Sequence, residues 1–226
     1  MLRIESPGIR EISIASVQMG DLFYSLLLAL GAFGLGACPF SVWIGQWRLG
    51  KDIRDYGDGN PGSANVFRSG SRKLGSLALG LDILKGVPFV ALAHWFFNLS
   101  EPAVLVVSVS AILGHAFSPL LRFKGGKAVA ITFGVMLALP QHEILAAFAV
   151  FMVLGFLFIQ SDSWAVILAA AGSLACLAIM GARPWETLFM LCVLAILVLK
   201  HYRELQTIPS LNGRLIGWLQ IKGRET

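Results

Sequence analysis

Long apolar segments joined by short polar connections make up most of this chain. An α-helix needs roughly 20 largely apolar residues to cross about 30 Å of hydrocarbon. Seven apolar segments can be distinguished: Leu22–Trp47, Leu74–Phe97, Ala103–Leu121, Ala128–Leu139, Ile144–Ile159, Trp164–Gly181 and Trp185–Leu199. The pattern predicts an all-α fold, namely a polytopic membrane helix bundle with about seven transmembrane helices.

Composition supports a bilayer environment and excludes several classes of function. Charged residues make up 14% of the 226 positions, whereas soluble domains carry about 25%. The net charge of +5 does not indicate a nucleic-acid partner, because the Lys and Arg residues are interleaved with apolar runs. Neither a metal site nor a disulfide is expected, because the three cysteines lie in apolar stretches without metal-ligand spacing: Cys38, Cys176 and Cys192.

The distribution of Lys and Arg indicates how the chain crosses the membrane. The fourth segment provides about 18 Å of helix, too short to span alone, so it could instead fuse with the fifth. Seven spans place fourteen Lys and Arg on one face against three on the other, whereas six spans give ten against seven. Cytoplasmic connections are enriched in these residues, so seven spans are favoured, with the N-terminus outside and the C-terminus inside.

This topology predicts a multi-pass protein of the cell (inner or plasma) membrane with three regions. Residues 1–20 form an N-terminal extension, because they are charged and lack the apolar core of a signal peptide. Residues 21–200 form the transmembrane domain, and residues 201–226 form a cytoplasmic tail. The polar loops that could carry chemistry then lie on the cytoplasmic face.

The first cytoplasmic loop, from Gly57 to Arg68, is rich in Gly and Asn. Both residues accept positive φ with little steric penalty, which lets successive N–H groups converge on an anion. Asn60, Ser63 and Asn65 add side-chain donors, and Arg68 adds a cationic fork. The loop is therefore a candidate phosphate cradle, and a flexible polar loop is the alternative interpretation.

The second loop carries Gly125-Gly126-Lys127 directly before the short fourth segment. Two glycines permit close backbone approach at a helix N-terminus, where unpaired N–H groups and the helix dipole favour an anion. This is a second candidate anion site. We interpret Arg122 and Lys124 as ordinary positive-inside anchors.

Three further features lie within or just after apolar segments. Asp82 and Lys85 are three residues apart on one helical face, which predicts a buried structural ion pair near the site rather than a catalytic pair. Gly80 and Gly86 would let a neighbouring helix pack closely. His201 follows the last segment and could accept a proton, although an interfacial His is more often a polar helix end.

Together these motifs resemble the bacterial acyl-phosphate-dependent glycerol-3-phosphate acyltransferases, small polytopic enzymes that begin phospholipid synthesis. The resemblance extends from Gly36 to Leu139 through Asp52-Ile53-Arg54, Gly59-Asn60-Pro61-Gly62, Asn65-Val66-Phe67-Arg68, Leu81-Asp82-Ile83-Leu84-Lys85-Gly86, Gly114-His115 and Phe123-Lys124-Gly125-Gly126-Lys127. It implies transfer of a fatty acyl group from acyl phosphate to glycerol 3-phosphate, giving lysophosphatidic acid and phosphate. The implied partners are these two substrates and membrane lipid, and neither a metal nor another cofactor is implied.

The resemblance also implies roles for individual residues. The catalytic residues would be Arg68, Lys127 and His201. Phosphate-binding roles would belong to Gly59, Asn60, Gly62, Ser63, Asn65, Gly125 and Gly126. In this family the substrate phosphate is thought to help deprotonate the acceptor hydroxyl, which is consistent with a chain that has no evident Ser-His-Asp triad.

Several positions depart from the family pattern. The pattern has Ser, Thr and Asn where this chain has Asp58, Ala64 and Glu204, and it has Arg where this chain has Thr207. An ionised carboxylate near a phosphate is unfavourable unless it is paired. Asp58 and Glu204 should therefore either have cationic partners or be held away from the bound phosphate. The available cations are Arg54, Lys73, Lys200 and Arg203.

Two alternatives to this enzyme stay open. One is a divergent paralogue with another acyl acceptor or a non-catalytic binding role. The other is a small transporter or channel that uses Asp82, Lys85 and the basic loops as an anion path. The succession of family motifs favours the enzyme.

Overall fold

The computed structural model describes residues 7–210, and their side chains from residue 20 onward. The predicted N-terminal extension is thus described in part, and most of the predicted tail lies outside the described residues. No β-strand occurs in the described range. The helices are α1 (Pro7–Ala37), α2 (Phe40–Ile44), α3 (Ser63–Arg68), α4 (Arg72–Leu84), α5 (Pro88–Ala91), α6 (Glu101–Ala116), α7 (Val129–Ala138), α8 (His142–Phe158), α9 (Asp162–Met180) and α10 (Pro184–Leu205).

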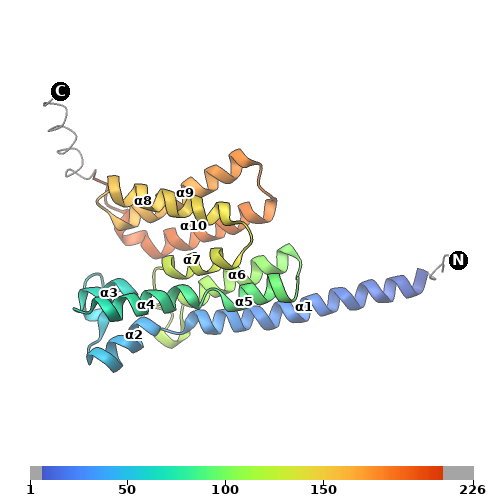
Figure 1. Ribbon diagram of the computed structural model, residues 1–226, viewed down its shortest axis with the longest axis horizontal. Helices are drawn as coiled ribbons and strands as arrows, with labels where there is room; N and C mark the ends of the chain where they lie inside the picture. The colour runs from blue at the N-terminus through green and yellow to red at the C-terminus, as the bar shows by residue number, and fades with distance from the viewer. Residues whose placement is uncertain (1–6, 211–226) are drawn as a thin grey trace.

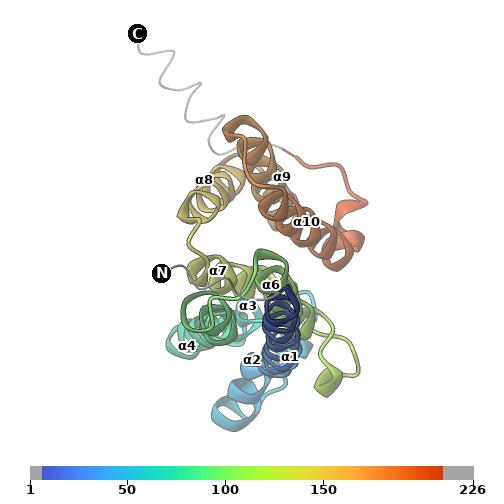
Figure 2. The same ribbon diagram turned by 90° about the vertical axis from the view of Figure 1, so that its right-hand side faces the viewer.

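The helices form two groups that meet at α7. Figures 1 and 2 show α1, α4, α5 and α6 together on one side, and α8, α9 and α10 together on the other, with α7 between them. The short helices α2 and α3 lie at the end of the bundle opposite the start of α1 (Figure 1). Two short 3₁₀ turns, η2 (Ile53–Asp55) and η4 (Pro119–Leu121), belong to the loops at that end. These loops carry the polar motifs.

Prolines divide the predicted apolar segments into shorter helices. The first segment breaks between α1 and α2, where Cys38 precedes Pro39, and continues as the π-helical turn η1 (Gly45–Leu49). The second breaks before Pro88, the first residue of α5, and ends in the π-helical turn η3 (Leu92–Phe96). Proline lacks an N–H group and disfavours helix at the residue before it. Pro140 likewise lies between α7 and α8, so the fourth and fifth segments form two separate helices rather than one continuous helix.

The chain is an all-helical integral membrane protein, whereas the number of crossings stays a prediction. Among the described residues, four helical stretches are long and apolar enough to cross a bilayer: Gly20–Leu49, Arg72–Phe96, Glu101–Leu121 and Asp162–Met180. The ten residues of α7 give about 15 Å of helix, too little to span alone. Large apolar side chains such as Leu26, Leu30 and Ile179 are exposed on the outer faces, as expected for surfaces that contact lipid.

Glycines allow the closest helix contacts. A Cβ atom on Gly114 of α6 would collide with the Phe33 carbonyl oxygen of α1, and one on Gly134 of α7 would collide with the Ile83 carbonyl oxygen of α4. Gly86, as expected, also faces α7, whereas Gly80 has open space around it. Helices in a bilayer associate through close backbone packing rather than through the hydrophobic effect. These contacts hold α7, and the loop before it, against the first group of helices.

The Asp82–Lys85 pair joins α4 to the break between α1 and α2. Lys85 Nζ lies 2.7 Å from Asp82 Oδ1, and both side chains are almost fully buried. Lys85 also donates to the Cys38 carbonyl oxygen at 2.8 Å, and Ser41 Oγ donates to Asp82 Oδ2 at 2.7 Å. The lysine thus satisfies a carbonyl that the end of α1 leaves without a helical partner. The pair fixes where the first loop begins.

Replacing one member of this pair should destabilise the protein. We expect Lys85→Met to lower stability by about 3–5 kcal/mol, because it leaves the Asp82 carboxylate buried without its cation. The double variant Asp82→Asn/Lys85→Met should recover much of that loss. Thermal unfolding of the protein in detergent measures both effects, with the exposed Lys73→Met as a control. A double variant no more stable than Lys85→Met would contradict this account.

Candidate active site

The first loop is an ordered polar structure organised by Asn65. This side chain is fully buried in α3. Its Nδ2 donates to Asp58 Oδ1 at 3.0 Å and to the Asn60 carbonyl oxygen at 2.9 Å, while its Oδ1 accepts from Arg68 Nη1 at 2.9 Å. Gly57 and Gly59 both have positive φ, 58° and 72°, the conformation that favours glycine. The loop therefore presents a defined set of donors.

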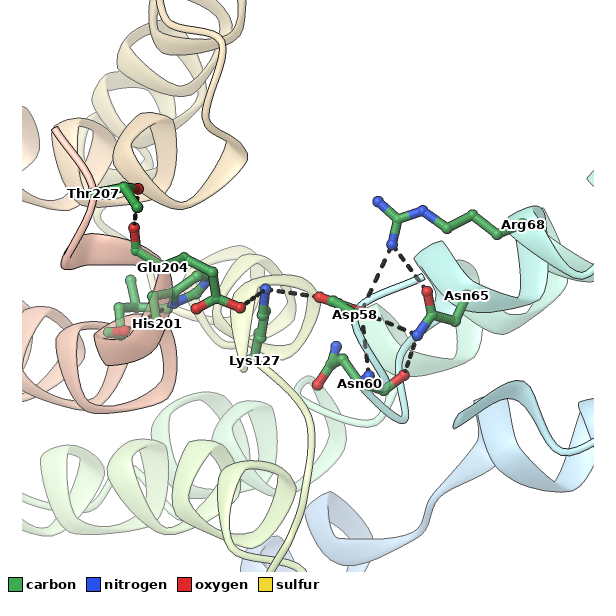
Figure 3. Close-up of polar contacts among 9 residues, drawn as sticks. Asp58, Asn60, Asn65, Arg68, Lys127, His201, Glu204 and Thr207 are labelled. Atoms are coloured by element: carbon green, nitrogen blue, oxygen red, sulfur yellow. Dashed lines mark hydrogen bonds and ion pairs between the residues drawn. The ribbon is translucent and has the colours of Figure 1, made fainter. Parts of the chain in front are cut away.

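Lys127 lies between this loop and the end of α10. Its Nζ is 2.8 Å from Asp58 Oδ2 and 2.9 Å from Glu204 Oε1. Figure 3 shows the lysine between the two carboxylates, with Asn65 and Arg68 on the far side of Asp58. Arg68 Nη1 lies 3.6 Å from Asp58 Oδ1. Two cations and two carboxylates are thus gathered at one place from three distant parts of the chain.

These contacts shift the pKa values of both partners in the loops. Partial burial alone raises the pKa of Asp58, but its bonds from Lys127, the Asn60 N–H and Asn65 outweigh that effect and hold the pKa below its ordinary value. Burial alone lowers the pKa of Lys127, but its bonds to Asp58 and Glu204 outweigh it and raise the pKa. Both groups are therefore charged at neutral pH.

Asp58 and Glu204 have a cationic partner, as expected, but it is Lys127 rather than any of the four candidates, and two of those candidates have other partners. Arg54 pairs with Asp52 two residues away, through Nε at 2.9 Å. Lys200 donates to the carbonyl oxygens of Ala116 and Gly125 at 2.8 and 2.9 Å. Lys127 neutralises both carboxylates in this structure, and its expected role in holding substrate phosphate stays a prediction.

The Gly125-Gly126 pair positions Lys127 by packing on His115 of α6. The Gly126 N–H donates to the His115 carbonyl oxygen at 3.0 Å, so this amide would have to leave that bond to contact an anion. A Cβ atom on Gly125 would collide with the same carbonyl oxygen, and one on Gly126 with the His115 ring. The Gly114-His115 motif is part of the family resemblance, but no role was predicted for this His. The adjacent glycines indicated close backbone approach, whereas the sequence does not show that the neighbour is His115.

His201 is buried in the last turns of α10. Its Nδ1 lies 2.8 Å from the Leu197 carbonyl oxygen. A carbonyl oxygen only accepts hydrogen bonds, so Nδ1 carries the proton and Nε2 is left as an acceptor in the neutral ring.

Several of these residues line one cavity of about 520 Å³ between the two groups of helices. Its polar lining includes Asp58 and six of the predicted site residues: Asn60, Gly62, Ser63, Arg68, Lys127 and His201. Its apolar lining comes from α4, α7, α8 and α9: Leu79, Ile83, Ala130, Phe133, Phe156 and Val166. The apolar lining was not predicted, because it depends on how the helices are placed in space. Such a cavity can accept a molecule with an anionic head and a long apolar chain.

Comparison with known proteins agrees with this arrangement. Residues 26–210 match the family model described as glycerol-3-phosphate acyltransferase. The chain belongs to the glycerol-3-phosphate acyltransferase family. A relative of that name from Listeria monocytogenes is 36% identical over 197 residues, which are 86% of this chain and 98% of the relative. One from Lactococcus lactis is 33% identical over 192 residues, 82% of this chain and 90% of the relative.

Solved acyltransferase structures have the same fold. PlsY (YgiH), an integral membrane glycerol 3-phosphate acyltransferase, is similar in its glycerol 3-phosphate form with a TM-score of 0.72 and 28% identity. Its lysophosphatidic acid form gives a TM-score of 0.70 and 27% identity. In both cases the match covers 80% of this chain and 90% of the other.

The packing of Gly125 provides a test of how Lys127 is positioned. We expect Gly125→Ala to lower the unfolding temperature by several degrees, because the new methyl group meets a backbone oxygen that cannot turn away. Gly80→Ala is the matched control: it adds the same methyl group in open space on α4 and should be neutral or slightly stabilising. Thermal unfolding of the two variants measures the difference. Equal effects would show that His115 does not constrain the second loop.

Proposed function

We propose that this protein transfers a fatty acyl group from acyl phosphate to the primary hydroxyl of glycerol 3-phosphate, giving 1-acyl-glycerol 3-phosphate and inorganic phosphate. Family membership supports the acceptor and the product class. The observation that carries the proposal is that one cavity has both kinds of lining. Arg68, Lys127 and the first loop line its polar part, and apolar side chains line the rest. Both substrates carry phosphate, and the donor also carries an acyl chain.

The cavity suits a reaction that depends on positioning and electrostatics. The acceptor hydroxyl oxygen would attack the acyl carbonyl carbon, the bond from that carbon to the phosphate oxygen would break, and the hydroxyl proton would pass to a substrate phosphate. An acyl phosphate is already activated, so the protein needs chiefly to align the two substrates and offset negative charge. We assign charge stabilisation to Arg68 and Lys127, and orientation through Nε2 to His201.

We further propose that the site faces the cytoplasm, with seven spans and the N-terminus outside. The support is the concentration of Lys and Arg in the loops that carry the site. In Figure 1 those loops lie at the end of the bundle opposite the start of α1.

Cysteine labelling tests this orientation. A cysteine introduced after Ser6 should react with a membrane-impermeant reagent applied from outside, and one introduced after Lys222 should react only after permeabilisation. Native cysteines would first be replaced by Ser. The reverse labelling pattern would contradict the proposed topology.

Substitution of the two cations tests the proposed activity. Lys127→Ala and Arg68→Ala should each lower turnover at least tenfold, because each removes about 1.4 kcal/mol or more of transition-state stabilisation. Arg122→Ala, at an exposed position outside the cavity lining, should have little effect. The assay measures phosphate release and lysophosphatidic acid formation by protein in lipid, with acyl phosphate offered with and without glycerol 3-phosphate. Equal losses at all three positions would indicate general basicity rather than a site.

A further inference from the structure

The Asp58 carboxylate bonds to the groups that the proposed function assigns to substrate phosphate. Its Oδ1 accepts from the Asn60 N–H at 3.2 Å and from Asn65 Nδ2 at 3.0 Å. Its Oδ2 is 2.8 Å from Lys127 Nζ, and Arg68 Nη1 approaches Oδ1 to 3.6 Å. These groups are donors of the first loop and the two cations of the cavity. An internal carboxylate therefore already uses the groups that a phosphate would need.

Glu204 differs from Asp58 in what it contacts. Its carboxylate pairs with Lys127 at 2.9 Å, but the donors of the first loop bond to Asp58. Glu204 thus reduces the charge that Lys127 offers, whereas Asp58 takes up the cradle itself. Glu204 therefore acts through its charge on Lys127, whereas Asp58 also occupies the hydrogen-bond donors of the first loop.

Asp58 can leave this position without opening the protein core. Its side chain is 33% exposed, so it can turn toward water, where hydration replaces the hydrogen bonds that it gives up. It lies in a surface loop between Gly57 and Gly59 rather than within a helix. A phosphate monoester carries about −1.5 to −2 charges and three acceptor oxygens, so it can replace a single carboxylate at these donors.

We propose that Asp58 is a built-in competitor that occupies the anion cradle of the empty site, so that position 58 sets the affinity of the protein for phosphate monoesters. If the cradle is open in only a fraction of the protein molecules, the apparent affinity for the ligand is reduced by that fraction. The inference rests on the proposed function in one respect, namely that the cradle binds substrate phosphate. It adds a residue that determines how tightly the substrate is held.

Binding of inorganic phosphate and of glycerol 3-phosphate to the full chain in lipid nanodiscs tests the proposal by calorimetry. Asp58→Asn keeps the shape of the side chain, and Asp58→Ser removes most of it. Both should tighten binding about tenfold, since each removes the negative charge that competes for Lys127 and Arg68. The control Asp55→Ser removes an exposed charge three residues away and should leave affinity unchanged. Glu204→Asn should give a smaller gain than either Asp58 variant.

Kinetics on the same variants separate competition from a structural role. A competitor predicts that Asp58→Asn lowers the KM for glycerol 3-phosphate, whereas loss of a merely structural contact would not. Affinity that is unchanged or weaker in both Asp58 variants, with unfolding temperatures close to that of the wild type, would overturn the proposal even if the wild type acylates glycerol 3-phosphate. Tighter phosphate binding in a protein that acylates no glycerol 3-phosphate would support the competitor and refute the proposed acceptor.

Discussion

The Lys127 ammonium group, bonded to Asp58 at 2.8 Å and to Glu204 at 2.9 Å, joins the first loop to the end of α10. These parts of the chain belong to the two helix groups, and Lys127 stands just before α7, which lies between them. Lys127 is partly buried, and its charge is balanced by the two carboxylates. Removing the lysine would leave both carboxylates without their shared cation. The empty site therefore depends on this lysine for its charge balance.

The lipid environment explains why the supports of this lysine are glycines and buried charges. Apolar side chains gain little by leaving hydrocarbon for a helix interface, so close packing and polar contacts must position the helices. Gly134 lets α7 approach α4, and Gly125 lets the second loop approach His115. The Asp82–Lys85 pair and Ser41 hold the break after α1. Each contact constrains one of the loops that border the cavity.

Local chemistry made part of this structure predictable from sequence. Hydrophobicity and charge predicted a polytopic helix bundle, and the family was recognised from short motifs such as Gly125-Gly126-Lys127. The helix breaks at Pro39 and Pro88 were not predicted from hydropathy, because an apolar run stays apolar where a proline interrupts its helix. The partner of Asp58 was predicted wrongly, because Arg54 has a closer carboxylate in Asp52 and the sequence does not show such competition. The roles of the site residues stay predictions.

A structure of the protein with glycerol 3-phosphate bound in lipid tests the central claim most directly. The account predicts that the phosphate contacts Asn65, Arg68 and Lys127, and that Asp58 has turned toward water, well beyond its 2.8 Å distance from Lys127 in the empty site. A bound phosphate at another place, with the Asp58–Lys127 pair intact, would contradict it.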